Sequence, residues 1–381
     1  MNDVKSQLNI LLLKIAEEIS ISQSMLDEAI SSYEAVGKWL GDGIEYDVRI
    51  SPQGSMNLGT TIKPISDKDD YDIDLVCMLE NGQRLDSFDI KNIVGQRLKE
   101  NAVYRKKILA EGEGTRCWKM QYNAFHMDIL PCVPKYYYNE PRLTDIRLTH
   151  KISSSIYEDR FSNPYGYRKW FEQRMINIVK KEKELYASRN KIEIEDVPIF
   201  RIKTPLQVAI QLMKRHRDIY FQYDDENAPI SIIITTLAAK AYKGEENIYD
   251  ALVGILNSMS NYIENRNGIY WVQNPVMNEE NFADKWQKYP NRKNAFYTWL
   301  ESAKDDFLKK PLNVEGLDKL SELFIYSLGE GPVKRAFRSY GESIRKARED
   351  NKLYSSDLIK GLSLIKSNSA TKVKGHTFFG E

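Results

Sequence analysis

The stretch from Tyr71 to Leu79, with the sequence YDIDLVCML, constrains the fold of this chain more than any other. Its odd-numbered positions are all apolar, so the run predicts a buried β-strand with those residues on its core face. Asp72 and Asp74 are two residues apart, and side chains at that spacing lie on the same face of a strand. The sequence therefore predicts a strand with one apolar face and two neighbouring carboxylates on the other.

Two neighbouring carboxylates repel each other, and burying them is costly unless a cation compensates. Mg²⁺ prefers oxygen ligands and keeps positions open for substrate phosphates. Upstream, Gly54 lacks a Cβ and Ser55 offers a short hydroxyl, a pair that suits a phosphate cradle. Downstream, Asp128 is the single acid in the apolar run 125–131, which predicts a second strand beside the first. An Asp-x-Asp pair alone is typical of a solvated strand end. Because Gly54 and Ser55 precede this pair and Asp128 follows it, the sequence favours a three-carboxylate site for two Mg²⁺ ions, with Mn²⁺ as a substitute.

The order of these motifs resembles that of the polymerase-β-like nucleotidyltransferases. The segments QGSMNLGTTIKP, YDIDLV and HMDILP resemble the bacterial cyclic-oligonucleotide synthases of the CD-NTase family, of the clade D type. The resemblance implies an α+β, bilobal nucleotidyltransferase with a mixed-sheet palm lobe, a helical second lobe and a long N-terminal helix bracing both. The site residues that it implies are the catalytic, metal-binding Asp72, Asp74 and Asp128 and the nucleotide-binding Gln53, Gly54 and Ser55.

Two further candidate residues lie in the predicted helical lobe. A helix predicted at about 204–221 carries Gln207, Gln211 and Lys214 on one face, a polar stripe that is either a solvated surface or a groove wall. The resemblance implies that Lys214 contacts the donor triphosphate. It implies the same role for Ser231, which opens the next predicted helix.

The periodicity of the chain predicts four regions. These are a helical brace at 1–40, the palm core at 41–160, the helical lobe at 161–366 and a flexible tail at 367–381. The palm is predicted to contain further strands at 45–51, 103–109 and 115–122 and a helix at 89–101 with Asp89 near its cap. The helical lobe is predicted to contain helices at 164–188, 204–221, 230–242, 248–265, 278–288, 291–309, 313–327 and 330–350.

Composition narrows the classes of partner and compartment. Cys77, Cys117 and Cys132 lie far apart in sequence and are predicted to be small core residues in a reducing compartment. No apolar run approaches the length of a membrane span and no signal-peptide pattern opens the chain, so we expect a cytoplasmic protein without a membrane partner. The net charge of +1 argues against an obligate duplex-DNA binder. Residues 332–374, however, carry eleven Lys and Arg against four Asp and Glu. This local excess of positive charge indicates either a solvated helix face or a surface that docks a nucleic acid, a product or a partner.

The resemblance implies a reaction and a setting. The chain would join ATP, with or without GTP, into a cyclic di- or trinucleotide that activates a separate effector in antiphage defence. The alternatives are an RNA or tRNA 3′-end nucleotidyltransferase, a non-cyclic oligoadenylate synthase, and a non-catalytic nucleotide-binding module. Some family members end in a tail that a ubiquitin-transfer-like enzyme joins to other molecules. The ending His376–Gly380 is similar to such a tail, although the chain finishes in Glu381 rather than glycine.

Overall fold

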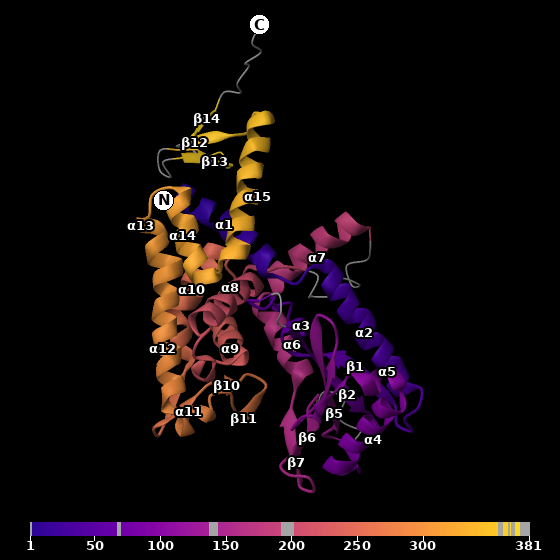
Figure 1. Cartoon of the computed structure of the whole chain (residues 1–381). Helices are drawn as coiled ribbons and strands as arrows, with labels where there is room; N and C mark the ends of the chain where they lie inside the picture. Colours follow the sequence, from indigo (N-terminus) through magenta and orange to yellow (C-terminus); the bar gives the residue numbers. More distant parts are fainter. Residues whose placement is uncertain are drawn as a thin grey trace. The chain divides into compact units, whose positions relative to one another are not determined.

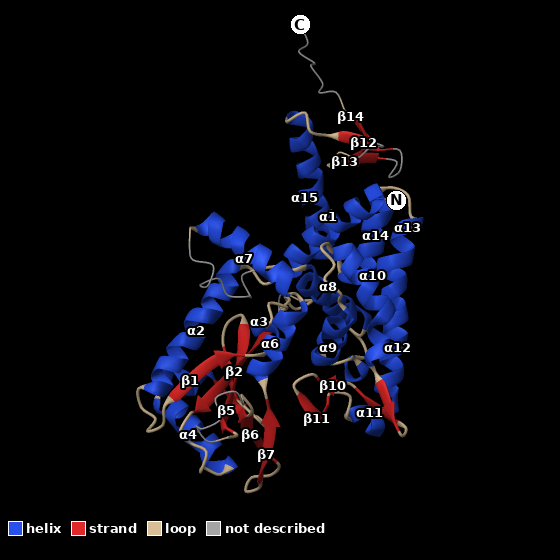
Figure 2. Cartoon of the chain, turned by 180° about the vertical axis from the view of Figure 1, so that it is seen from behind, coloured by secondary structure: helices blue, strands red, loops and turns tan. Residues whose placement is uncertain are grey.

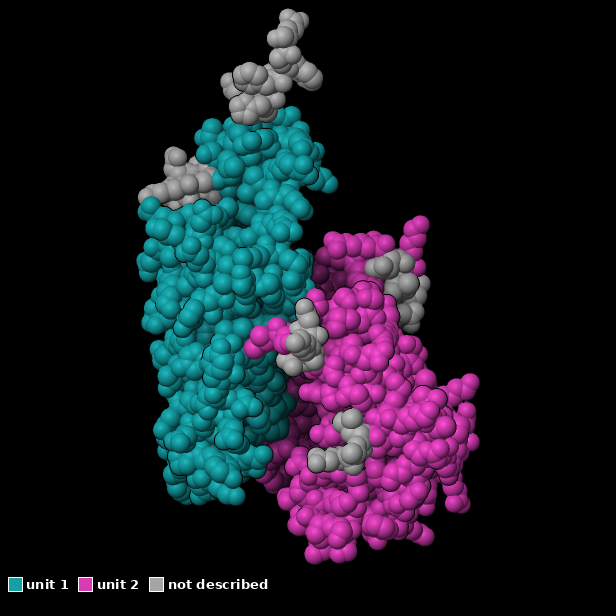
Figure 3. Space-filling model, in the orientation of Figure 1, with its two compact units in different colours: residues 1–20, 204–273, 281–381 teal, residues 21–203, 274–280 magenta. Residues whose placement is uncertain are grey.

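A computed structural model describes residues 2–66, 70–136, 144–191, 202–356, 361–364, 366 and 370–373 of the 381-residue chain. The fold is α+β, as predicted, and it divides into two compact units (Figures 1 and 3). Unit 1 comprises residues 1–20, 204–273 and 281–381, and unit 2 comprises residues 21–203 and 274–280. No helix in the described ranges is both long enough and apolar enough to cross a membrane.

Unit 2 is built on a mixed, seven-stranded sheet (Figure 2). Its central strands, β2 (Tyr71–Leu79) and β5 (Phe125–Pro134), are parallel neighbours, and every other pairing with a described register in this sheet is antiparallel. The strand order is β1-β2-β5-β4-β3, and β6 pairs with both β5 and β7. The other strands are β1 (Val48–Pro52), β3 (Ile108–Glu113), β4 (Trp118–Gln121), β6 (Ile146–Lys151) and β7 (Tyr157–Ser162).

Helices α2 (Gln23–Gly41) and α4 (Ser87–Glu100) pack on one face of this sheet and form the main core with it. The odd-numbered residues of β2 all belong to that core, as their alternation predicted. On the opposite face, Val76 and Met78 join a smaller apolar cluster with residues of β5 and β6. The remaining helices of unit 2 are α3 (Gly54–Asn57), α5 (Ala102–Lys107), α6 (Pro164–Arg174) and α7 (Ile176–Asn190).

Unit 1 is a helical assembly around α8 (Pro205–Tyr220), whose residues from Pro205 to His216 are all buried. Helix α1 (Asn2–Ile19) packs against α8, α10 and α15. The other helical segments are η2 (Asp225–Asn227), α9 (Ser231–Ala241), α10 (Ile248–Ser258), η3 (Met259–Tyr262), α11 (Lys285–Lys288), α12 (Pro290–Lys304), η4 (Asp305–Lys309), α13 (Lys310–Asn313), α14 (Leu317–Leu328) and α15 (Glu330–Glu349). Short strands lie between and after them: β8 (Glu264–Arg266), β9 (Ile269–Trp271), β10 (Gln273–Asn274), β11 (Met277–Asn281), β12 (Tyr354–Ser356), β13 (Gly361–Ser363) and β14 (Ala370–Lys372).

The N-terminal segment, expected as a long helical brace, forms two separate helices. Helix α1 ends at Ile19, and α2 begins after Ser22, whose hydroxyl accepts a hydrogen bond from the backbone N–H of Met25 at 3.2 Å. Such a side-chain cap begins a new helix because it satisfies a backbone donor that lacks a partner in the first turn. Helix α1 belongs to unit 1 and α2 to unit 2.

Several predicted elements of the palm are corrected. The expected strand at 103–109 begins as helix α5, because the Asn101 side chain accepts hydrogen bonds from the N–H groups of Val103 and Tyr104 and caps a helix there. The predicted helix near Asp89 starts earlier, with Asp86 as its N-cap. Strand β4 is shorter than the predicted range 115–122.

The helical lobe also departs from its predicted boundaries. Helices α6 and α7 belong to unit 2 and not to the helical lobe. Asn163, the N-cap of α6, accepts a hydrogen bond from the Thr144 hydroxyl and donates one to Asp145, each at 2.8 Å, which joins the start of α6 to unit 2. The predicted helix at 278–288 is instead β11 followed by the short α11, and the one at 248–265 ends at Ser258 before β8.

Part of the predicted flexible tail is a strand. Residues Ala370–Lys372 form β14, which pairs antiparallel with β12, and the N–H of Val373 donates to the carbonyl of Leu353 at 2.9 Å. Backbone pairing of this kind fixes the segment to the end of unit 1. The ending His376–Gly380 lies outside the described residues.

Candidate active site

Strands β2 and β5 bring the three predicted aspartates together. Their register pairs Asp74 with Asp128 and Asp72 with His126. Register partners in neighbouring strands point to the same side of a sheet, so the three carboxylates share the face opposite the main core. Asp72 is exposed there, whereas Asp74 and Asp128 are half-buried.

The turn at Gln53, Gly54 and Ser55, predicted as a phosphate cradle and here named the phosphate turn, lies directly against these acids. Gly54 has φ 61°, and a Cβ on it would lie only 2.6 Å from Oδ2 of Asp74. The backbone N–H of Gln53 donates to the carbonyl of Asp74 at 2.8 Å. Glycine is therefore required at position 54 both for its left-handed conformation and for the close approach. The turn is therefore held directly beside Asp74 by a hydrogen bond and by the close approach of Gly54.

The Ser55 hydroxyl is oriented by the same turn. It accepts a hydrogen bond from Oγ1 of Thr61 at 3.1 Å, and the Ser55 carbonyl accepts one from the N–H of Thr60 at 2.9 Å. Because the Ser55 oxygen is already an acceptor, its own hydrogen is left to donate. That hydrogen is available to a phosphate oxygen at the mouth of the turn.

The charges of the aspartates act on one another. Although part of the Asp72 side chain is exposed, the surrounding protein removes some of the water around its carboxylate. This desolvation, and then the negative charge of Asp128, raise the pKa of Asp72 above its ordinary value, while His126 and Lys119 offset part of the rise. Carboxylates that destabilise each other in this way provide the oxygen-rich, electronegative setting that a divalent cation prefers. Within the described part of the chain, no three His, Cys, Asp or Glu side chains are already arranged to hold a metal ion.

Cys117 contributes to the site in a way that sequence reasoning missed. Its thiol donates to Oδ2 of Asp128 at 3.2 Å, and burial together with the Asp128 charge raises the pKa of Cys117 to about 12. All three cysteines are buried and free, as predicted. Nothing in the spacing of Cys117 from Asp128 signals this contact, because it depends on the turn between β3 and β4.

Strand β4 adds residues to the same face that the sequence analysis did not single out. The register pairs Lys119 with Asp128 and Gln121 with His126. Oδ2 of Asp70 lies 3.0 Å from Nε2 of His126 and accepts from the Gln121 amide at 2.5 Å. The alternation in Trp118–Gln121 was the available signal, since it places Lys119 and Gln121 together opposite the core.

The predicted residues of unit 1 lie on α8 and α9. Gln207, Gln211 and Lys214 are all buried, so the solvated-surface interpretation of their stripe is wrong. Gln207 instead completes a capping box with Thr204, accepting from the Thr204 N–H at 2.8 Å. Ser231 is the first residue of α9, and its hydroxyl oxygen lies 3.4 Å from both terminal nitrogens of Arg217.

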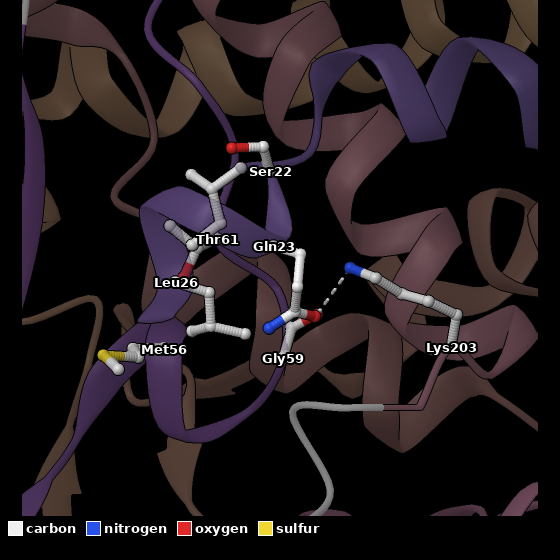
Figure 4. A pocket seen from close by; sticks show the side chains of 8 residues that line it. Ser22, Gln23, Leu26, Met56, Gly59, Thr61 and Lys203 are labelled. Carbon is white, nitrogen blue, oxygen red and sulfur yellow. Dashed lines mark hydrogen bonds between the residues drawn. The ribbon is translucent and has the colours of Figure 1, made fainter. Parts of the chain in front are cut away.

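A small cavity of about 120 Å³ lies beside the phosphate turn, within unit 2 (Figure 4). Lys203 lines it and donates to the carbonyl of Gly59 at 3.4 Å. Desolvation of its ammonium by the surrounding protein lowers the pKa of Lys203 to about 8, although part of the residue is exposed. The other lining residues are Ile21, Ser22, Gln23, Leu26, Met56, Gly59 and Thr61.

Comparison with known proteins identifies a family model and several relatives that resemble this chain. The family model for the nucleotidyltransferase domain of DncV-like cyclic GMP-AMP synthases matches residues 48–132, which include the phosphate turn and all three aspartates. The chain is 33% identical to a c-di-GMP synthase of Roseivirga ehrenbergii over 91% of both sequences. It is 23% identical to the cyclic dinucleotide synthase CdnG of Bradyrhizobium diazoefficiens over 88% of this chain and 84% of that protein. The solved structure of CdnG in complex with GTP superposes with a TM-score of 0.68, at 21% identity, over 88% of this chain and 99% of that one.

Proposed function

Because the chain belongs to the CD-NTase family of nucleotidyltransferases, we propose that it condenses two molecules of GTP into cyclic di-GMP. The observation that carries the nucleotidyl-transfer step is the approach of Gly54 to Oδ2 of Asp74, with Asp128 opposite Asp74 in the sheet. This arrangement suits a triphosphate on the turn with its α-phosphate beside the carboxylates.

Each half of the reaction is the same displacement. A ribose hydroxyl oxygen of the acceptor forms a bond to the α-phosphorus of the donor, and the bond from that phosphorus to pyrophosphate breaks. We propose that the hydroxyl proton passes to the carboxylate of Asp128, which is half-buried and lies between Asp74 and Lys119 in the sheet. A second displacement within the linear intermediate closes the ring and releases a second pyrophosphate.

The three aspartates suit Mg²⁺ because their carboxylates supply the oxygen ligands that Mg²⁺ prefers. We propose that Asp72, Asp74 and Asp128 hold two Mg²⁺ ions together with the oxygens of the substrate phosphates, and that Mn²⁺ can replace them. When bound, such ions would lower the pKa of the acceptor hydroxyl and neutralise charge on the leaving pyrophosphate.

The remaining nucleotide contacts follow from the orientation of individual groups. The Ser55 hydroxyl has a hydrogen to donate to a phosphate, and the N–H of Gln53 holds the turn against Asp74.

We also propose that Lys214 and Ser231 contact the donor triphosphate. The Arg217 guanidinium donates to the Ser231 oxygen, which leaves the Ser231 hydrogen free for a phosphate.

The choice of GTP rests on two relatives of this chain. One relative is a c-di-GMP synthase at 33% identity, and CdnG is known in complex with GTP. The sequence prediction put ATP first with GTP as a possible second substrate, so ATP is the alternative that the test must include. We further propose that the product activates a separate effector in antiphage defence. Attachment of the tail to another molecule also remains a proposal.

The direct test is incubation of the purified chain with Mg²⁺ and each α-labelled nucleoside triphosphate, alone and in pairs. We expect GTP alone to give a phosphatase-resistant product with the mass of cyclic di-GMP. Asp128→Asn should give none. Extension of added RNA, a linear product only, or no turnover with any nucleotide would contradict the proposal. A cyclic product that requires ATP would retain the reaction and correct the base.

A further inference from the structure

The strand order of unit 2 assigns opposite sides to the two substrates of a nucleotidyl transfer. The phosphate turn approaches the acids at Asp74 on β2, whereas Asp128 lies on β5, and β4 follows beyond it. In an in-line displacement the attacking and leaving oxygens lie on opposite sides of the phosphorus. If the leaving pyrophosphate occupies the turn at β2, the acceptor nucleotide must approach from the side of β5 and β4.

On that side of the sheet, Lys119 is an exposed cation. It is the register partner of Asp128 and shares the face of the three acids. Its Cε lies 3.2 Å from the position that a Cβ on Gly114 would occupy, next to the sulfur of Cys117, which itself bonds to Asp128. The end of the lysine stem therefore lies near Cys117, whose thiol bonds to the third aspartate.

The neighbouring groups on this face are already engaged with each other. His126 and Gln121 both contact Oδ2 of Asp70. In contrast, the ammonium of Lys119 forms no hydrogen bond or ion pair with any described residue. The Lys119 ammonium is exposed near three carboxylates but forms an ion pair with none of them. It therefore suits a ligand that carries more negative charge than one carboxylate, such as a polyphosphate.

We propose that Lys119 binds the 5′-triphosphate of the acceptor nucleotide, which makes the open face of β4 the acceptor subsite. This inference rests on the proposed nucleotidyl transfer and adds a residue to it. A rival explanation is that Lys119 only offsets the charge of the aspartates. That explanation predicts an equal effect on every acceptor, whether or not the acceptor carries phosphates.

The test separates donor from acceptor. Labelled 2′,3′-dideoxy-GTP can donate its nucleotidyl group but has no ribose hydroxyl to accept one. With this donor in excess, the acceptor is either GTP or guanosine, and the labelled linear product is measured as a function of acceptor concentration. We expect Lys119→Gln to raise the half-saturating concentration of GTP by about tenfold, the loss of one charge-assisted contact, and to leave that of guanosine unchanged.

Two further variants complete the design. Lys119→Arg keeps the charge and should restore most of the GTP preference. Lys106→Gln removes an exposed lysine from α5 in the same unit and should behave as the wild type. Equal changes for GTP and guanosine in Lys119→Gln, or no change for either, would overturn the assignment while the transfer reaction stands. If the wild-type chain forms no labelled product with either acceptor, the proposed function fails and the subsite fails with it.

Discussion

The two faces of β2 and β5 show how one pair of strands can serve both folding and chemistry. On the core face, Ile73 is 1% exposed and Leu75 is fully buried, and both belong to the main apolar core. On the other face, Asp72 and Asp74 occupy the first half of β2, and apolar Val76 follows them into the smaller cluster. The same backbone therefore carries a fully packed face and a charged, partly open one.

The difference between the faces indicates where stability and activity reside. Burial of apolar side chains stabilises the fold, whereas carboxylates that repel each other cost stability unless a ligand compensates. Residues on the core face should thus affect unfolding, and residues on the acidic face should affect turnover. Each prediction below tests that separation.

The largest effect is expected for Asp72→Asn combined with Asp74→Asn. Removing both charges should lower nucleotidyl transfer to below about one-thousandth of the wild-type rate, because electrostatic stabilisation of the transferred phosphate is lost. The melting temperature without divalent ions should stay the same or rise. Turnover assays and thermal unfolding measure the two effects.

The residue between the two acids provides the matched control. Ile73→Ala should cost about 2–5 kcal/mol of unfolding free energy, since it removes buried atoms from the main core. At temperatures where this variant is folded, it should still transfer nucleotides. Loss of stability in the aspartate variant, or loss of turnover in a folded Ile73→Ala, would contradict the separation of the faces.

Gly54→Ala should reduce turnover while leaving most of the fold intact. Its Cβ would lie 2.6 Å from Oδ2 of Asp74, and the φ of 61° costs a residue with a side chain about 1–2 kcal/mol. We expect at least about a tenfold loss of rate, because the added Cβ would displace the Asp74 carboxylate from its position beside the turn. Gly41→Ala is the control, because no atom lies within 4 Å of the added Cβ. Wild-type activity in Gly54→Ala would separate the turn from the acids.

Ser55→Ala should weaken GTP binding by about 1.5–3 kcal/mol, the contribution of a hydrogen bond to a charged group. Thr61→Val removes the hydroxyl that donates to Ser55 but leaves the Ser55 hydroxyl in place, so it should have a smaller effect. Calorimetry with a non-hydrolysable GTP analogue measures both affinities. Unchanged affinity in Ser55→Ala would assign its hydroxyl to the structure of the turn alone.

The smallest effect is a pH dependence of stability. The pKa of Asp72 is raised in the folded chain, so between its ordinary value of 3.8 and the raised value the folded state binds more protons than the unfolded state. Stability therefore falls as pH rises through that window. Without divalent ions, Asp72→Asn should melt higher than the wild type at neutral pH, and the difference should vanish below pH 3.8. A difference that is independent of pH would indicate another cause.

The sequence was sufficient for the parts of the site that depend on local spacing. The alternation in β2 predicted its two faces, and the single acid in the run 125–131 predicted a neighbouring strand with Asp128. The turn at Gly54 was expected because a Gly-Ser pair precedes the strand. These features follow from strand periodicity, which is a property of a few consecutive residues.

Other features could not be found in this way because they depend on register. Lys119 lies beside Asp128 through the antiparallel pairing of β4 with β5, and Cys117 reaches Asp128 from the turn that precedes β4; no local pattern specifies either. Likewise, the Gln207 side chain has the spacing of a surface stripe, yet it is used in a buried capping box. Asn101 turned an alternating, strand-like segment into helix α5 by capping it.

The most direct test of the account is anomalous diffraction from crystals grown with Mn²⁺ and a non-hydrolysable GTP analogue. We predict manganese peaks at about 2.0–2.5 Å from carboxylate oxygens of Asp72 and Asp74, one of them also bound by Asp128, with the triphosphate on the turn at Gly54 and Ser55. Manganese bound elsewhere, or a nucleotide whose phosphates do not approach the three aspartates, would contradict the claim that this face of the sheet is the catalytic site.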